Sequence, residues 1–372
     1  MNLMSEPIRV LQIIGLSCGG GVEAVIMNYY RHIDKSKVQF DFVVHKNPLQ
    51  SFADEAKSMG AKVYEVTPYT QNIIKFTYEI YRIIKEGNYK IVHSNMNSLS
   101  GFPLLAAYFA GANVRILHNH TTDTKEEGFR TTIKRMLRPF AKVFANQCWA
   151  CSKLAGVWMY GKGAVKNNKV TIINNAIDLD KFAFNQEKRD ELRKELGLEG
   201  KFVIGHVGRF MKQKNHEFLI DIFAEVVKQK ENAVLLLVGE GQLMGLIKNK
   251  VNDLNLTDKV IFLGVRSDVA DLYNVMDVFV FPSFYEGLGM VAVEAQVNGL
   301  PVIASTEVPE EAKVNENIIF VDLGIVSEVW ADKTLAISDE MRERNNKSVI
   351  TSGFDIRVES KKLESLYMEK SV

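Results

Sequence analysis

The stretch PSFYEGLGMVAVEAQVNGLP (Pro282–Pro301) decides the fold that the rest of the chain must support. It overlaps the apolar run VFVFPS (Val278–Ser283), which predicts a buried strand, and it continues through a glycine loop into MVAVEAQVNG, which predicts a helix ended by Gly299. A glycine loop that opens a helix leaves backbone N–H groups available, and these donors favour an anion such as phosphate. The stretch therefore predicts a strand–loop–helix unit with an anion-binding loop.

Two carboxylates accompany this loop. Glu286 stands in it, and Glu294 is expected about two turns into the helix, at a rise of ~1.5 Å per residue. Together they can grip the hydroxyls of a sugar nucleotide while the loop amides take its phosphates. Two solvated surface carboxylates fit the same spacing, so the choice between these interpretations depends on the rest of the chain.

Length and composition limit the classes of function. The chain has 372 residues, of which 47% are hydrophobic and 24% charged, as expected for two globular domains. The formal net charge of +1 gives no overall case for nucleic acid. No apolar run is long enough to span a bilayer, and MNLMSEPIRVLQIIG lacks the layout of a signal peptide, so a cytoplasmic location is expected.

The three cysteines, Cys18, Cys148 and Cys151, are too few for a disulfide framework. Cys148 and Cys151 form a C-x-x-C, but they end an apolar segment and lack a second ligand pair for zinc. A redox pair is the minority interpretation. We expect reduced, buried, small apolar residues.

Short β-rich runs alternate with helical patterns along the whole chain, which predicts an α/β fold with parallel sheets covered by helices on both faces. The rhythm breaks at residues 176–195, which become charged. We therefore expect two doubly wound, Rossmann-like domains, 1–178 and 179–354, with an amphipathic C-terminal helix in 355–372. The predicted strands are RVLQIIG, FDFVVH, AKVYEV, YKIVHSN, VRILHNH, QCWACS and VTIINN in the first domain and FVIGHVG, AVLLLVGE, KVIFLG, VFVFPS, PVIAS and IIFVDL in the second.

Ligands of such sheets bind at the carboxyl ends of the strands. The first strand ends in GLSCGGGVEA, which is not the dinucleotide pattern G-x-G-x-x-G, so the case for NAD is weak. The fifth strand ends in His118-Asn119-His120, whose two imidazoles point to one face. A metal would need a third ligand. A hydrogen bond to a substrate hydroxyl suits one of them better, and two structural histidines remain the alternative.

The second half contains GHVGRFMKQKNHEF, with Arg209 directly after a strand and Lys214 just before a helix. A guanidinium fork and an ammonium point charge are how proteins hold a diphosphate, although two solvated loop cations fit equally well in isolation. LVGEGQLMGLI and VIFLGVRSDVADLY follow, and Arg266 comes after the second of these strands.

Taken together, GGVE, GRFMKQKN, VGEG, FLGVRSDV and the E-x7-E of Glu286 and Glu294 followed by NGLPVIAS resemble glycosyltransferase family 4, in order and over nearly the whole chain. These are retaining enzymes of the GT-B fold, with a cleft between two domains and a C-terminal helix that crosses back to the first. The stretches GGVEAVIMNYYRHID and VRILHNH are most similar to bacterial capsule and exopolysaccharide enzymes.

The resemblance implies roles for matching positions. Arg209 and Lys214 would clamp the nucleotide diphosphate as leaving group, Glu286 would hold the donor sugar, and His120 would contact that sugar. Glu23 and His118 would face the acceptor. The remaining donor-binding positions would be Gly20, Gly21, Arg266, Gly287, Leu288, Gly289 and Glu294.

The same resemblance implies transfer without a metal or other cofactor, since the two cations stabilise the charge that develops on the leaving diphosphate. Asp178-Leu179-Asp180 lies in the interdomain stretch and is not expected to bind a metal. UDP is the expected nucleotide, on family frequency alone. A sugar-nucleotide epimerase and a non-catalytic sugar-nucleotide-binding subunit remain alternatives.

In GFRTTIKRMLRPFAKVF, four basic residues, Arg130, Lys134, Arg138 and Lys142, recur at every fourth position. A basic amphipathic helix over 130–144 can lie on an anionic membrane surface, at the inner face of the cell membrane, where a lipid-linked acceptor would be found. A solvated face over a packed stripe is the competing interpretation.

Overall fold

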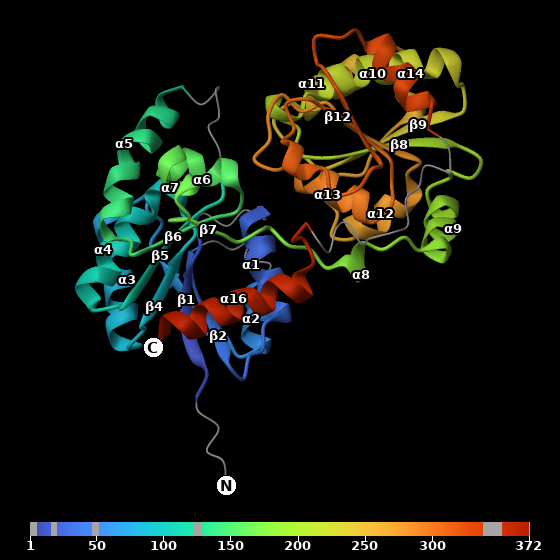
Figure 1. Cartoon of the computed structure of the whole chain (residues 1–372). Helices are drawn as coiled ribbons and strands as arrows, with labels where there is room; N and C mark the ends of the chain where they lie inside the picture. The colour runs from blue at the N-terminus through green and yellow to red at the C-terminus, as the bar shows by residue number, and fades with distance from the viewer. Residues whose placement is uncertain (1–5, 16–20, 47–51, 122–127, 338–351, 372) are drawn as a thin grey trace. The chain divides into compact units, whose positions relative to one another are not determined.

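The computed structural model describes residues 6–15, 21–46, 52–121, 128–337 and 352–371, and within these ranges the side chains of 128–131 and 134 are not described. Two compact units divide the chain, one of Met1–Ile177 with Gly353–Val372 and one of Asp178–Ser352. In both sheets every strand pairing among the described residues is parallel (Figure 1). The prediction of two doubly wound α/β domains is confirmed.

The first unit is built on a seven-stranded sheet of order β3-β2-β1-β4-β5-β6-β7. The strands are β1 (Ile8–Ile13), β2 (Val38–His45), β3 (Val63–Val66), β4 (Ile91–Ser94), β5 (Val114–Asn119), β6 (Gln147–Ala150) and β7 (Thr171–Ile172). The helices are α1 (Gly21–His32), α2 (Ala53–Ser58), α3 (Ile73–Glu86), α4 (Gly101–Ala110), α5 (Gly128–Phe144), α6 (Lys153–Tyr160), α7 (Lys162–Lys166) and α16 (Ile356–Ser371), with a 3₁₀ turn η1 (Asn97–Ser100).

Successive strand residues of this sheet enter two different cores, as expected for a parallel sheet buried on both faces. Val10 packs in the core under α1, α2 and α16, whereas its neighbour Leu11 packs in the core under α3 and α4. The C-terminal helix α16 lies beside α1, β1 and β2 (Figure 1), and its Ile356, Leu363 and Tyr367 are part of the first core. The last segment of the chain therefore completes the first unit.

The second unit is built on a six-stranded sheet of order β10-β9-β8-β11-β12-β13. The strands are β8 (Phe202–Val207), β9 (Ala233–Val238), β10 (Val260–Phe262), β11 (Val278–Phe281), β12 (Val302–Ser305) and β13 (Ile318–Val321). The helices are α8 (Leu179–Phe182), α9 (Gln186–Glu195), α10 (His216–Gln229), α11 (Met244–Asp253), α12 (Val269–Val275), α13 (Met290–Val297) and α14 (Ser327–Leu335), with 3₁₀ turns η2 (Lys212–Lys214), η3 (Thr257–Lys259) and η4 (Glu310–Ala312).

In both sheets the strand order reverses beside the first strand, between β1 and β4 and between β8 and β11. Connections leave in opposite directions on the two sides of such a switch point, so the loops part there and leave room for a ligand at the carboxyl ends of the strands. The two switch points are where the polar residues described below are found.

Candidate functional site

The loops that follow β8 and β11 flank the switch point of the second sheet, and they bring two predicted site residues together. Lys214 Nζ lies 2.8 Å from Glu286 Oε1, and the two side chains are only 15% and 7% exposed. The ammonium also lies 4.7 Å from the centre of the Phe281 ring. The largely buried ammonium thus has a carboxylate and an aromatic face as neighbours, and both attract a cation.

Side chains of the β8 loop bind the backbone of the β11 loop. Gln213 Nε2 donates to the Tyr285 carbonyl over 3.0 Å, and the Phe284 amide donates back to the Gln213 carbonyl over 2.9 Å. Asn215 adopts the left-handed conformation at φ 53° and donates to the Pro282 carbonyl over 3.1 Å. These bonds fix the loop that carries Lys214 to the loop that carries Glu286.

The glycines of VGEG allow the β9 loop to press against the β8 loop. A Cβ on Gly239, whose φ is +128°, would lie 2.2 Å from the Gly208 carbonyl oxygen, and one on Gly241 would lie 2.5 Å from the Phe210 carbonyl oxygen. Only glycine fits such close backbone contacts. The VGEG motif is therefore a packing requirement of the site.

The glycine loop opens α13, as predicted. Gly289 precedes the helix in the left-handed conformation at φ 84°, and Leu288 is buried beneath the loop. The helix begins where it was expected, but the expected position of Glu294 two turns into it was wrong, because the four positions from Met290 to Glu294 span little more than one turn.

Glu294 accepts a hydrogen bond from Tyr273 Oη over 2.9 Å. Burial raises the pKa of the Glu294 carboxyl to about 7, although the Tyr273 bond and the charges of Lys181 and Lys214 oppose the shift. Burial therefore favours the neutral, protonated form of this carboxyl. Its sensitivity to Lys214 indicates that the two groups share one electrostatic environment.

The two predicted arginines have different surroundings. Arg209 is exposed, in the loop directly after β8. Arg266 forms a two-bond ion pair with Asp268, with Nε 2.8 Å from Oδ1 and NH2 2.6 Å from Oδ2, and this hydrogen bonding lowers the pKa of the Asp268 carboxyl. The guanidinium of Arg266 is thereby held in one orientation.

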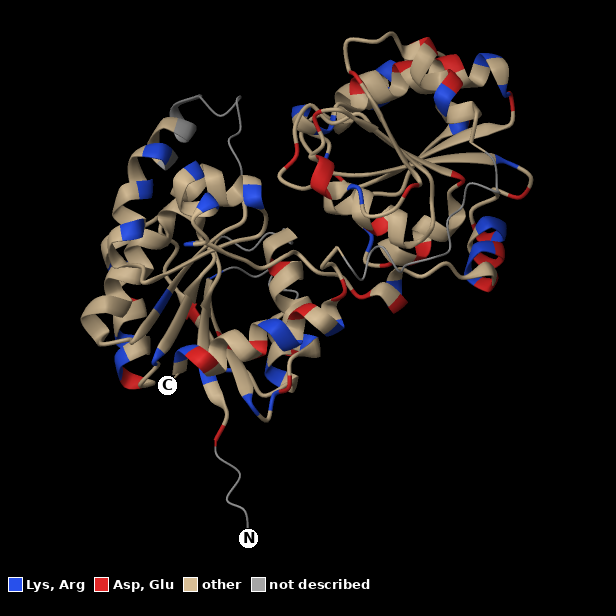
Figure 2. Ribbon diagram, viewed as in Figure 1, with Lys and Arg blue, Asp and Glu red and all other residues tan. Residues whose placement is uncertain are grey.

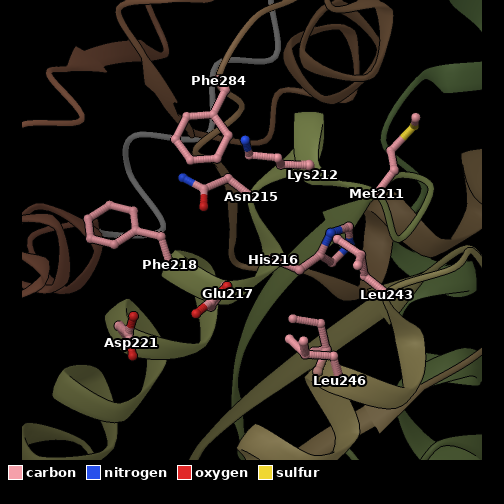
Figure 3. Close-up of a pocket in the computed structure, with 11 residues that line it drawn as sticks. Met211, Lys212, Asn215, His216, Glu217, Phe218, Asp221, Leu243, Leu246 and Phe284 are labelled. Atoms are coloured by element: carbon pink, nitrogen blue, oxygen red, sulfur yellow. The ribbon is translucent and has the colours of Figure 1, made fainter. Parts of the chain in front are cut away.

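A pocket of about 280 Å³ lies beside the same β8 loop and is shown in Figure 3. The predicted residues Arg209, Lys214, Glu286 and Glu294 do not line it. Its lining residues are Met211, Lys212, Asn215, His216, Glu217, Phe218, Asp221, Leu243, Leu246, Ile247 and Phe284. The pocket therefore shares Asn215 and Phe284 with the two tied loops but does not contain the predicted site residues.

In the first unit, His120 follows β5 and is half-buried, whereas His118 within β5 is only 4% exposed. Their rings lie 4.0 Å apart between centres. Glu23 is largely buried in α1, and Gly21 begins that helix with open space where a side chain would be. Gly20 lies outside the described residues. The deep position of His118 suits a structural role better than contact with an acceptor.

Several residues that position the site escaped prediction, among them Gln213, Asn215, Asp268 and Tyr273. Gln213, Asn215 and Tyr273 act through side-chain bonds to residues distant in the sequence, and no local motif marks such bonds. Asp268 pairs with Arg266 only two positions away. A weaker signal existed for the first unit, where the polar residues Gln12 and His93 lie within the short buried strands β1 and β4.

Among the described residues, no group of three or more His, Cys, Asp or Glu is arranged to hold a metal ion. Asp178 instead caps α8 by accepting from the backbone N–H groups of Asp180 and Lys181. Cys148 and Cys151 are free thiols, and burial raises the pKa of Cys151 to about 12. Cys18 lies outside the described residues.

Comparison with known sequences agrees with this organisation. The family described as Glycosyltransferase Family 4 matches residues 19–181, and the family described as Glycosyl transferases group 1 matches residues 188–335. A Bacillus subtilis protein named as a glycosyltransferase, EpsF, is 34% identical over 357 residues, which cover 93% of both chains.

Two further relatives match over nearly their whole length. The UDP-Gal:alpha-D-GlcNAc-diphosphoundecaprenol alpha-1,3-galactosyltransferase of Escherichia coli is 27% identical and is covered fully, as is this chain. The capsular polysaccharide biosynthesis glycosyltransferase CapH of Staphylococcus aureus is 24% identical, with 98% of this chain and 100% of CapH covered.

Among solved structures, Anabaena Alr3699/HepE in complex with UDP and glucose has the same fold, with a TM-score of 0.79, 21% identity, and 96% of this chain and 99% of that chain covered. The sheet topology, the motif order and the full-length sequence similarity agree with one another. The chain belongs to glycosyltransferase family 4 and is a glycosyltransferase.

Proposed function

We propose that this enzyme transfers a sugar from a UDP-sugar to a saccharide or a lipid-linked saccharide, with retention of the anomeric configuration. The observation that carries the proposal is the ion pair of Lys214 and Glu286 at the switch point of the second sheet. A buried cation beside a helix start favours a diphosphate, and a carboxylate next to it can accept hydrogen bonds from sugar hydroxyls.

In the reaction, the bond between the anomeric carbon and the diphosphate oxygen breaks, and a bond to the acceptor oxygen forms on the same face. The acceptor proton passes to the diphosphate oxygen. Negative charge grows on the leaving diphosphate as its bond breaks, so Lys214 and Arg209 stabilise the transition state more than the bound substrate. These two cations supply the electrostatic assistance, and the proposed chemistry calls for no further cofactor.

Glu294 and Arg266 are proposed to bind the nucleoside. A carboxylate on the first turns of α13 can accept from ribose hydroxyls, and the Arg266–Asp268 pair offers a planar group beside a base. UDP is our first choice of nucleotide because UDP is named with both the Escherichia coli relative and the HepE structure.

A panel of UDP-, GDP- and ADP-sugars tests the donor. A ligand that binds only the folded protein raises the melting temperature, so UDP-sugars should raise it most. Mass spectrometry with saccharide acceptors should then detect transfer. Isomerised donor without acceptor would favour the epimerase, and binding without turnover would favour the subunit. A melting temperature that no nucleotide-sugar raises would contradict the proposal.

We also propose that α5 contacts an anionic membrane surface, where a lipid-linked acceptor would be found. Basic bands without acidic residues run along its described part (Figure 2), and Met136 and Val143 are 74% and 73% exposed. Arg138 is not available to bind lipid headgroups. Its guanidinium donates to the Trp158 carbonyl, and Cζ lies 5.0 Å from the centre of the Trp158 ring. Among the described residues, no helix is long and apolar enough to cross a membrane.

Flotation with vesicles of phosphatidylglycerol and phosphatidylcholine tests this contact. The protein should float with anionic vesicles, and Lys142→Glu combined with Met136→Ser should reduce the bound fraction. Lys57→Glu on α2 is the control with a similar charge change elsewhere on the first unit. Wild-type protein that stays with the unbound fraction would end the proposal.

A further inference from the structure

Six side chains of the first unit form one continuous line of hydrogen bonds at the switch point between β1 and β4. His120 Nε2 contacts Asn95 Oδ1 at 3.0 Å, and Asn95 Nδ2 contacts Gln12 Oε1 at 3.0 Å. Gln12 Nε2 contacts Tyr367 Oη at 3.0 Å, and this hydroxyl contacts His93 Nδ1 at 2.6 Å. His93 Nε2 contacts His118 Nδ1 at 3.0 Å. We call this line the His120 chain.

The direction of the His120 chain is set by a backbone carbonyl. Asn95 Nδ2 lies 3.4 Å from the His93 carbonyl oxygen as well as 3.0 Å from Gln12 Oε1. With the amide turned over, two oxygens would face each other at that carbonyl, which is unfavourable. Asn95 therefore presents Oδ1 to His120, and His120 must donate to it from a protonated Nε2.

The orientation of Asn95 also determines the donors and acceptors from Gln12 to His118, at the other end of the His120 chain. Gln12 uses its oxygen for Asn95, so its NH2 donates to Tyr367. The Tyr367 hydroxyl then directs its only proton to His93 Nδ1, and the His93 proton on Nε2 goes to His118 Nδ1. All donors point one way, which leaves each imidazole neutral with its proton on Nε2.

The surroundings keep this arrangement in place. The six residues line one cavity of about 20 Å³, which is room for roughly one water molecule. Burial lowers the pKa of His120 to about 4, with Asn175 opposing the shift, and it lowers the pKa values of His93 and His118 well below their ordinary range. Neutral imidazoles at neutral pH follow from this burial.

We propose that Tyr367, on the C-terminal helix, is a positioning residue that acts through Gln12 and Asn95 to hold His120 as a hydrogen-bond acceptor. His120 Nδ1 is buried and makes no hydrogen bond of normal geometry to any described residue, and Asn175 is a polar side chain beside the same ring, so a substrate hydroxyl would donate to this nitrogen in place of a contact with Asn175. The inference rests on the proposed role of His120 at a sugar hydroxyl. It adds that Tyr367 on α16, together with the His93 carbonyl beside Asn95, determines which nitrogen of His120 meets that hydroxyl.

Tyr367→Phe is the direct test, because it keeps the ring and removes the hydroxyl that links α16 to Gln12. Tyr30→Phe is the matched control. Tyr30 is also fully buried, its hydroxyl donates to the Met59 carbonyl over 3.0 Å, and it lies outside the His120 chain. Gln12→Met removes the bonds to Tyr367 and Asn95 without changing a residue of α16, and it replaces Tyr367→Phe if that variant does not fold.

Imidazole ¹H–¹⁵N spectra of the full chain report which nitrogen carries the proton, and His120→Gln identifies the His120 signals. Wild type should show His120 protonated at Nε2. Tyr367→Phe should move the His120 signals and lower kcat/KM for the donor sugar about tenfold, the size expected for one lost hydrogen bond. UDP affinity should stay unchanged, and Tyr30→Phe should change neither readout.

A His120 proton on Nδ1 in the wild type would overturn the inference. So would a Tyr367→Phe or Gln12→Met protein with wild-type His120 signals and wild-type kcat/KM. Failure of the proposed function is distinguishable, because the spectra report the His120 proton whether or not the enzyme transfers sugar.

Discussion

The two sheets have the same strand order around their switch points, yet they place different chemistry there. Between β1 and β4 the first sheet gathers neutral amides, imidazoles and a phenol, whereas the loops after β8 and β11 gather a lysine and a carboxylate. One fold thus supports an uncharged site and a charged site at equivalent positions. The strand order determines where in the fold a site forms, and the side chains of the strands and loops determine what that site can bind.

The two sites also meet the cost of burial differently. Burying one unpaired charge costs several kcal/mol, roughly, and Lys214 and Glu286 offset this cost for each other. The neutral groups of the His120 chain cost less to bury, but each needs a partner of the correct donor or acceptor type. A substitution in the Lys214–Glu286 pair should therefore alter the charge of that site. A substitution in the His120 chain should alter which imidazole nitrogen carries the proton.

The largest effect is expected for Lys214→Ala. It removes the cation at the leaving diphosphate and leaves Glu286 buried without its partner, so kcat should fall roughly 10²- to 10³-fold. Steady-state transfer from the UDP-sugar measures this. Lys212→Ala is the control, because it removes the same charge from an exposed position in the same loop. Equal kcat values for Lys214→Ala and Lys212→Ala would show that the buried cation at the second switch point has no special role in transfer.

A large effect on stability is expected for Gly239→Ala. The new Cβ would lie 2.2 Å from the Gly208 carbonyl oxygen at a φ of +128°, so the free energy of unfolding should fall by about 3 kcal/mol. Gly245→Ala is the control, because a Cβ there meets no atom within 4 Å and alanine favours the helix.

Gly239→Ala also tests how independent the two sites are. The clash lies in the second unit, so urea denaturation should show the loss while the imidazole signals of His120 stay at their wild-type positions. Equal stability of the two glycine variants would show that the β9 loop can move away from the β8 loop.

The architecture could be read from the sequence because strand and helix periodicity is local. Every predicted strand is present, and the expected glycine cap stands after α13, with Gly299 at φ 80°. The ion pair of Lys214 and Glu286 joins two residues that were each identified from a motif. Their direct contact was not foreseen, since it depends on how the two loops are tied together.

The His120 chain could not be read from the sequence. Its members come from β1, β4, β5, α16 and the segments that follow β4 and β5, and Gln12 and Tyr367 are 355 positions apart. The histidine pair was predicted from its spacing, but the polarity of the chain depends on one amide beside one carbonyl. The basic periodicity of α5 was visible too, whereas the engagement of Arg138 by Trp158 needed the fold.

A smaller effect is expected from pH, and it concerns Glu294. Burial raises its pKa from an ordinary value of 4.5 to about 7 in the folded chain. Between these values the folded state binds more protons than the unfolded state, so this group lowers stability as pH rises from 4.5 to 7. The unfolding midpoint in urea, measured across that range, should fall less steeply in Glu294→Gln than in wild type. Parallel curves would mean that the carboxyl is well solvated, unlike the buried imidazoles of the first unit.

The smallest effect is expected for Tyr273→Phe. Its hydroxyl donates to Glu294 Oε2 over 2.9 Å, and loss of this bond should cost about 1 kcal/mol of stability. The bond lowers the pKa of Glu294, so the variant should move the titration of that carboxyl to higher pH, as ¹³C carboxyl shifts would report. Tyr78→Phe, at a 60% exposed position, is the control. An unmoved titration would mean that a neutral phenol does not tune the charged site. Hydrogen bonds would then determine the protonation of side chains at the first switch point but not at the second. The two switch points would differ in this respect as well as in charge.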